Sequence, residues 1–82
     1  MAEVNYYGAD WCVDCRRSKA FLNGNNVEFV ENNVEESAEL AAKAEAIAGR
    51  KNIPVIQFKD GEFLVEPSDA DLKAALVARG LL

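Results

Sequence analysis

The spacing of the apolar residues changes at Cys12, and this change limits the folds that are open to the chain. Residues 3–8 alternate in period two, with Val4 and Tyr6 on one face, and end in glycine, which predicts a strand. From Cys12 the apolar spacing becomes helical as far as a Gly-Asn-Asn stretch, and residues 27–31 then predict a second strand. Because a helix connects the two strands, we expect a right-handed crossover with parallel pairing.

Turn residues divide the rest of the chain in the same way. An Asp-Gly pair between two short apolar runs predicts a hairpin. The later segments predict a helix over 35–49, a strand over 54–58, a strand over 63–66 and a helix over 67–80. The expected α/β fold therefore has the order β-α-β-α-β-β-α, with a four-stranded mixed sheet and three helices.

Length, charge and apolar content exclude several classes of protein. With 82 residues, the chain has room for one small domain over 1–82. Its net charge of −5 argues against nucleic acid or an anionic membrane as a partner. There is no apolar run of about 18 residues and no signal-peptide pattern, so we expect a cytoplasmic protein. In that reducing compartment a permanent disulfide is not expected.

The two cysteines do not complete a metal site within one chain. A structural zinc site takes four ligands drawn mainly from cysteine and histidine, and this chain has two cysteines and no histidine. Asp10 and Asp14 lie beside the cysteines without the spacing of a metal motif. We therefore expect no metal bound by one chain, whereas a cluster shared between two chains stays open.

The spacing of Cys12 and Cys15 favours redox chemistry. Residues i and i+3 lie one above the other on a helix, so the pair can close a disulfide with little backbone movement. Cys12 falls where the strand ends and the helix begins, and the helix dipole there favours a thiolate. Arg16 and Arg17 add positive charge nearby, which Asp14 opposes. We therefore expect Cys12 to attack a disulfide and Cys15 to resolve the product.

Three further features border on this pair, and for each the residues leave two interpretations open. Trp11 is either part of the core or an exposed apolar lip beside the cysteines. The Ile53–Pro54 bond either starts a strand in the usual way or is one of the few cis bonds. Ser68 and Asp69 either cap the last helix or present its free N–H groups to a carboxylate.

Almost the whole chain resembles the glutaredoxin family, which has the thioredoxin fold. The resemblance rests on the segments YGADWCVDCRRSKAFL, GRKNIPVIQFKDG and LVEPSDADLKAAL, and mycoredoxin-like bacterial glutaredoxins have the most similar pattern. It implies that Cys12 is the nucleophile, that Pro54 is cis and faces the sulfurs, and that the Ile53 backbone pairs with substrate. It also implies that the turn at Ser68–Asp69 receives a carboxylate of the thiol co-substrate. The expected substrate-binding residues are Trp11, Arg16, Ile53, Pro54, Ser68 and Asp69.

The expected function is that of a small thiol-disulfide oxidoreductase. It would reduce protein disulfides, or mixed disulfides with low-molecular-weight thiols, with glutathione or mycothiol as co-substrate and no bound cofactor. Two departures from the glutathione-using pattern count against glutathione: Ala9 replaces a basic residue, and Glu66–Pro67 replaces Gly-Gly.

The expected partners are client proteins with disulfides, the small thiol and, as a further candidate, an NADPH-linked reductase; the chain itself is expected to be a monomer. One alternative is an electron donor to ribonucleotide reductase that thioredoxin reductase recycles, although the segment WSGFRP of such donors is absent. Others are an iron–sulfur cluster carrier that works as a dimer, and a redox-inert binding module.

Overall fold

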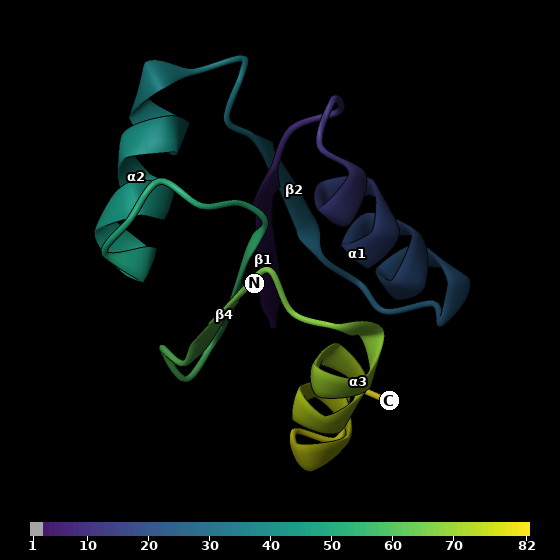
Figure 1. Cartoon of the computed structure of the whole chain (residues 1–82). Helices are drawn as coiled ribbons and strands as arrows, with labels where there is room; N and C mark the ends of the chain where they lie inside the picture. The colour runs from purple at the N-terminus through teal and green to yellow at the C-terminus, as the bar shows by residue number, and fades with distance from the viewer. Residues whose placement is uncertain (1–2) are drawn as a thin grey trace.

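The computed structural model describes residues 3–82 and confirms the predicted order of strands and helices (Figure 1). The strands are β1 (Val4–Gly8), β2 (Val30–Asn33), β3 (Val55–Phe58) and β4 (Phe63–Val65). The helices are α1 (Val13–Gly24), α2 (Ala38–Ala48) and α3 (Asp69–Ala78). None of the helices between residues 3 and 82 is long and apolar enough to cross a membrane.

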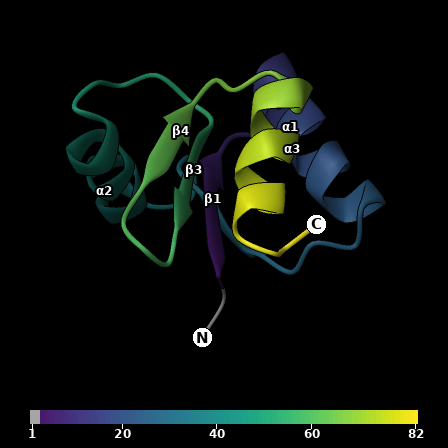
Figure 2. The ribbon, with the colours of Figure 1, turned by 90° about the horizontal axis from the view of Figure 1, so that it is seen from below.

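The four strands form one mixed sheet in the order β2-β1-β3-β4. β1 and β2 are parallel, as the crossover through α1 requires, whereas the β1–β3 and β3–β4 pairs are antiparallel. Figure 2 shows α1 and α3 on one side of the sheet and α2 on the other. This is the predicted thioredoxin-like architecture, and it places the end of β1 beside the start of α1.

The alternation of β1 divides its side chains between two cores. Val4 and Tyr6 pack on the side of α1 and α3, and Tyr7 packs on the side of α2. The larger core contains Cys15, Leu22, Val27, Ile56, Phe58, Leu72 and Leu76. The smaller core contains Ala44 and Val55, with Leu40 and Ile47 packed against it. These apolar residues of α2 and α3 therefore lie on the faces that the sheet covers.

The second strand begins later than predicted, at Val30 rather than at Val27. After α1 the backbone of Asn26 is left-handed, with φ of 56°, and the N–H of Val27 donates to the carbonyl of Leu22 at 2.9 Å. Val27 is buried in the core, but the pairing with β1 starts only where Val30 meets Asn5. The alternation of apolar residues indicates which side chains face the core. It does not indicate where the backbone hydrogen bonds between β1 and β2 begin.

The last two helices are shorter than predicted because their serines lie outside them. Ser37 and Ser68 are N-caps, and each hydroxyl accepts a hydrogen bond from the backbone N–H three residues later. At the other end of α3, the Arg79 guanidinium donates to the carbonyl of Ala75 at 2.9 Å, as expected for a cation near a helix C-terminus. It also pairs with Asp60 of the β3–β4 turn at 3.0 Å, which fixes α3 to the hairpin.

The core between α3 and the sheet yields a stability prediction. Leu76 is fully buried, so Leu76→Ala should lower the free energy of unfolding by about 2–5 kcal/mol, measured by denaturant titration. Val77 is the next residue of the same helix and is 51% exposed, so Val77→Ala should change it by less than about 0.5 kcal/mol. Equal losses in the two variants would contradict the packing described for α3.

Candidate active site

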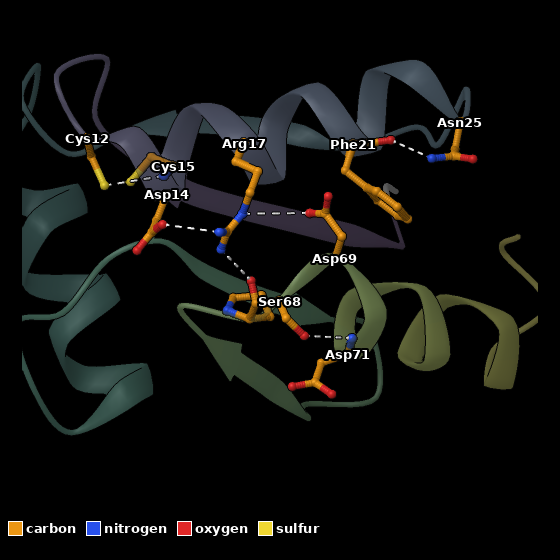
Figure 3. A network of polar contacts seen from close by, with 10 residues as sticks. Cys12, Asp14, Cys15, Arg17, Phe21, Asn25, Ser68, Asp69 and Asp71 are labelled. Carbon is orange, nitrogen blue, oxygen red and sulfur yellow. Dashed lines mark hydrogen bonds and ion pairs between the residues drawn. The ribbon is translucent and has the colours of Figure 1, made fainter.

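Cys12 is the N-cap residue of α1. The loop from β1 turns back at this point, with the N–H of Cys12 donating to the carbonyl of Ala9 at 3.3 Å. Its backbone is extended, with φ of −84° and ψ of 119°, and its sulfur accepts a hydrogen bond from the N–H of Cys15 at 3.2 Å (Figure 3). A cysteine therefore stands where helices usually have a serine or an aspartate. The free N–H groups and the helix dipole at this position favour negative charge on the sulfur.

Cys15 differs from Cys12 in exposure and in charge. Its side chain is fully buried in the larger core, whereas Cys12 is half-buried, and both are free thiols. Burial raises the pKa of Cys15 to about 12, and the hydrogen bond with Cys12 and the negative charge of Cys12 add to the rise. Cys15 is therefore a neutral thiol at neutral pH, and an incoming disulfide meets Cys12 first.

The segment before β3 lies against the Cys12 sulfur. The Ile53–Pro54 peptide bond is cis, as the resemblance implies. The Cys12 thiol approaches the carbonyl oxygen of Ile53 at 3.9 Å, so this backbone is the nearest wall of the site. Pro54 is buried, and its carbonyl accepts a hydrogen bond from the N–H of Glu66 at 2.9 Å. Two segments that are far apart in the sequence, 9–15 and 53–54, thus form the site.

A groove of about 440 Å³ lies where the residue before Cys12 and the residue before Pro54 come together. Trp11 and Ile53 line it, and they flank Cys12 and Pro54 in the sequence. Trp11 is 66% exposed, which decides in favour of the apolar lip over the core. The other lining residues come from the end of β2, from α2 and from the segment before Ile53: Val34, Ala38, Ala41, Ala42, Ala44, Glu45, Arg50, Lys51 and Asn52. The groove is therefore mainly apolar, and its charged lining residues are Glu45, Arg50 and Lys51.

Arg17 connects α1 to the start of α3. Its guanidinium donates to the carbonyl of Pro67 at 3.1 Å and pairs with Asp69 at 3.7 Å (Figure 3). It also pairs with Asp14 on its own helix at 3.4 Å. Arg16, by contrast, is exposed and makes none of these contacts with the α3 turn. The sequence presented Arg17 only as a source of positive charge, because its distant partners become neighbours only in the fold.

Glu66 has a left-handed backbone, with φ of 49°. Glycine adopts this conformation without the steric cost of about 1–2 kcal/mol that another residue pays. The Glu66 carboxylate accepts a hydrogen bond from the side-chain amide of Asn52 at 2.7 Å. This contact joins the end of β4 to the segment before the cis-proline. The sequence analysis noted the substitution at Glu66 but did not find its partner.

Ser68 and Asp69 open α3 as predicted, but they are already engaged by the protein. The Ser68 hydroxyl accepts from the N–H of Asp71 at 3.1 Å, and Asp69 faces Arg17. The capping interpretation of Ser68 is therefore confirmed, and a role in binding a carboxylate stays a prediction. Across residues 3–82 no group of three or more cysteine, histidine or acidic side chains is arranged to hold a metal ion.

With this geometry in place, comparison with known proteins gives a consistent result. Residues 4–64 match the glutaredoxin family. A protein of Mycobacterium tuberculosis that carries the name glutaredoxin is 31% identical, with 93% of this chain and 92% of that protein covered. Mycoredoxin 1 of Corynebacterium glutamicum is 27% identical, with 95% and 98% covered. The crystal structure of a glutaredoxin from Archaeoglobus fulgidus superimposes with a TM-score of 0.81 at 26% identity, covering 90% of this chain and 85% of that one.

The match to the family covers more than half of the chain, and the relative with 31% identity covers nearly all of it. The pair of cysteines at the start of α1 lies within the matched residues. The chain therefore belongs to the glutaredoxin family and is a thiol-disulfide oxidoreductase with a Cys12-x-x-Cys15 pair.

Proposed function

We propose that the protein reduces disulfides of client proteins, and mixed disulfides between proteins and small thiols, through a cycle that begins at Cys12. The observation that carries the proposal is the asymmetry of the two sulfurs. Cys12 is half-buried at a helix N-cap and accepts the N–H of Cys15 at 3.2 Å, whereas Cys15 is fully buried and protonated. This is the arrangement expected of an attacking and a resolving thiol.

In the first step the Cys12 thiolate attacks one sulfur of the client disulfide. The client S–S bond breaks, a bond to the Cys12 sulfur forms, and the second client sulfur leaves as a thiolate that takes a proton from water. Cys15 then loses its proton to solvent and attacks the Cys12 sulfur, which releases the first client sulfur. Two electrons have passed to the client, and the Cys12–Cys15 disulfide awaits reduction.

A low-molecular-weight thiol is proposed to reduce this disulfide, and the local charges favour a neutral thiol such as mycothiol over glutathione. Ala9 is only 2% exposed, so the position that is basic in glutathione-using relatives is here an enclosed methyl group. Asp69 and Glu66 lie on the α3 side, and Arg17 is already paired with Asp69. Glutathione brings two carboxylates to this surface, whereas the sugar portion of mycothiol carries no charge. The similarity to a mycoredoxin supports the same choice.

The groove next to Cys12 is proposed to receive the client chain beside its disulfide. Its lining is mainly apolar. The lining includes Trp11, which precedes Cys12, and Ile53, whose carbonyl oxygen lies 3.9 Å from the Cys12 sulfur. Arg50 and Lys51 outnumber Glu45 among the charged residues of the lining, and this positive excess would match an acidic client segment. A monomeric state, a cytoplasmic location and an NADPH-linked reductase remain predictions, as do the reductase-recycled donor and the cluster carrier.

Cysteine substitutions test the cycle. Cys12→Ser should abolish reduction of a protein disulfide and of a mixed disulfide with a small thiol, since no nucleophile is left. Cys15→Ser should retain the mixed-disulfide activity and should accumulate a covalent adduct with a protein disulfide, detected by intact mass. Wild-type rates in Cys12→Ser, in an assay coupled to a small thiol, would overturn the proposed function.

The pKa of Cys15 predicts selective alkylation. With a pKa of about 12, only about one Cys15 side chain in 100,000 is a thiolate at pH 7. Because the thiolate is the reactive form, iodoacetamide should label Cys12 first. Labelling of Cys15 should accelerate about tenfold for each pH unit below its pKa, measured by peptide mass spectrometry over a pH series. Equal labelling of the two cysteines at pH 7 would contradict the assigned roles.

A panel of reductants tests the choice of thiol. The oxidised protein is mixed with mycothiol, with glutathione and with NADPH plus thioredoxin reductase, and the exposed Trp11 reports opening of the adjacent disulfide by fluorescence. We expect mycothiol to act about 5- to 10-fold faster than glutathione, because an unfavourable charge pair near the surface costs about 1 kcal/mol. Equal rates would contradict a neutral thiol, and reduction by the reductase alone would favour the reductase-recycled donor.

A further inference from the structure

Gly8 and Tyr6 share a small space next to the resolving sulfur. Both residues lie on the face of β1 that packs against α1. A Cβ atom at position 8 would lie 2.3 Å from the Tyr6 hydroxyl oxygen and 3.1 Å from the Cys15 sulfur. The first distance is far below any real contact, so a larger residue at position 8 would force the Tyr6 ring out of its present place. The missing side chain of Gly8 thus makes room for a phenol hydroxyl beside Cys15.

The position of the Tyr6 hydroxyl is fixed by its surroundings. The side chain is 2% exposed, and its ring and that of Phe29 pack in an edge-to-face arrangement with centroids 5.9 Å apart. The hydroxyl donates to the backbone carbonyl of Cys15 at 3.2 Å. A buried hydroxyl with an O–H that rotates freely can exchange one acceptor for another without movement of the ring.

We propose that Tyr6 is a positioning residue for the resolving step: its hydroxyl turns from the Cys15 carbonyl to the Cys15 sulfur as that sulfur becomes a thiolate. This inference rests on the proposed dithiol cycle and adds to it. Cys15 is fully buried and needs a donor to carry negative charge, and the Tyr6 hydroxyl is held beside it.

The chemistry of the resolving step balances without any further reactant. The Cys15 S–H bond breaks and its proton passes to solvent, which returns it to the departing client sulfur. A bond forms between the sulfurs of Cys15 and Cys12, and the bond between Cys12 and the client breaks. Tyr6 keeps its own proton and supplies only the hydrogen bond. In the reverse direction, a small thiol attacks Cys12 and the same hydrogen bond stabilises Cys15 as the leaving thiolate.

The charges around the pair agree with this role. Burial raises the pKa of Cys15, and hydrogen bonds from the backbone N–H of Ala9 and from the Tyr6 hydroxyl act in the opposite direction. Burial also raises the pKa of Tyr6, so Tyr6 stays a protonated donor throughout the working range. The other titratable groups that act on the pair are Cys12 on α1 and Glu31 on β2, and the negative charge of each raises the pKa of Tyr6. Tyr6 is thus the side chain that favours the Cys15 thiolate against burial and like charge.

A chromogenic aryl disulfide, dithiobis-nitrobenzoate, separates the two steps. The reduced protein releases one coloured thiolate when Cys12 attacks and a second when Cys15 resolves the adduct. In stopped-flow absorbance, Tyr6→Phe should leave the first phase at the wild-type rate. It should slow the second phase about tenfold and shift its pH profile to higher pH, because a hydrogen bond to a charged group has been lost.

Tyr7→Phe is the matched control, because Tyr7 is an equally buried neighbour on the opposite face of β1. It should leave both phases and both pH profiles as in the wild type. Equal second phases in Tyr6→Phe, Tyr7→Phe and the wild type would overturn the inference while leaving the dithiol cycle intact. Absence of the first phase in the wild-type protein would instead overturn the proposed function.

Fluorotyrosine keeps the inference testable if Tyr6→Phe does not fold. The sequence has two tyrosines, so in Tyr7→Phe the analogue labels Tyr6 alone. Fluorotyrosine is the stronger hydrogen-bond donor, and the second phase should accelerate at constant pH with the first phase unchanged. A second phase that does not respond to the analogue would count against the role of the hydroxyl.

Discussion

The hydrogen bond from the Cys15 N–H to the Cys12 sulfur is the contact on which the other features of the site depend. This hydrogen bond makes Cys12 the N-cap of α1. The stability of the first turn of α1 is therefore coupled to the charge and bonding of the Cys12 sulfur. The parallel crossover brings β1 and α1 together, and the cis-proline segment forms the opposite wall.

The larger core, between the sheet and helices α1 and α3, buries Cys15 and leaves Cys12 half-exposed. This difference in burial distinguishes the two sulfurs. Cys15 shares its space with Tyr6, and Gly8 leaves that space open. A buried thiol next to a buried hydroxyl is inert toward reagents in solution but is already in place for an internal reaction. Packing therefore gives the two thiols different roles, attack for Cys12 and resolution for Cys15, although both lie at the start of α1.

The sequence predicted the order of the elements and the redox pair because both depend on local patterns. Period, capping residues and the Cys-x-x-Cys spacing are readable over a few neighbouring residues. The start of β2 was missed because Val27 and Phe29 turn their side chains inward before the pairing with β1 begins at Val30. The choice of Trp11 as lip rather than core needed the position of α2, which the local pattern does not give.

Contacts between distant segments were beyond the sequence alone. Arg17 contacts Pro67 and Asp69 only because α1 and α3 lie side by side in the fold. Asn52 contacts Glu66 only because the residue after β4 lies next to the segment before β3. For Tyr6 and Gly8 a signal was present, since residues two apart in a strand share a face. The alternation could have placed both beside α1, but the nearness of Cys15 required the structure.

Equilibrium titration of the wild-type protein in thiol–disulfide redox buffers tests the central claim most directly. Intact mass, read at each potential after acid quench and alkylation of free thiols, reports how many cysteines are oxidised and to what. The account predicts one reversible two-electron transition between the dithiol and an intramolecular Cys12–Cys15 disulfide. Separate one-cysteine adducts with the buffer thiol at every potential, with no intramolecular disulfide, would contradict it.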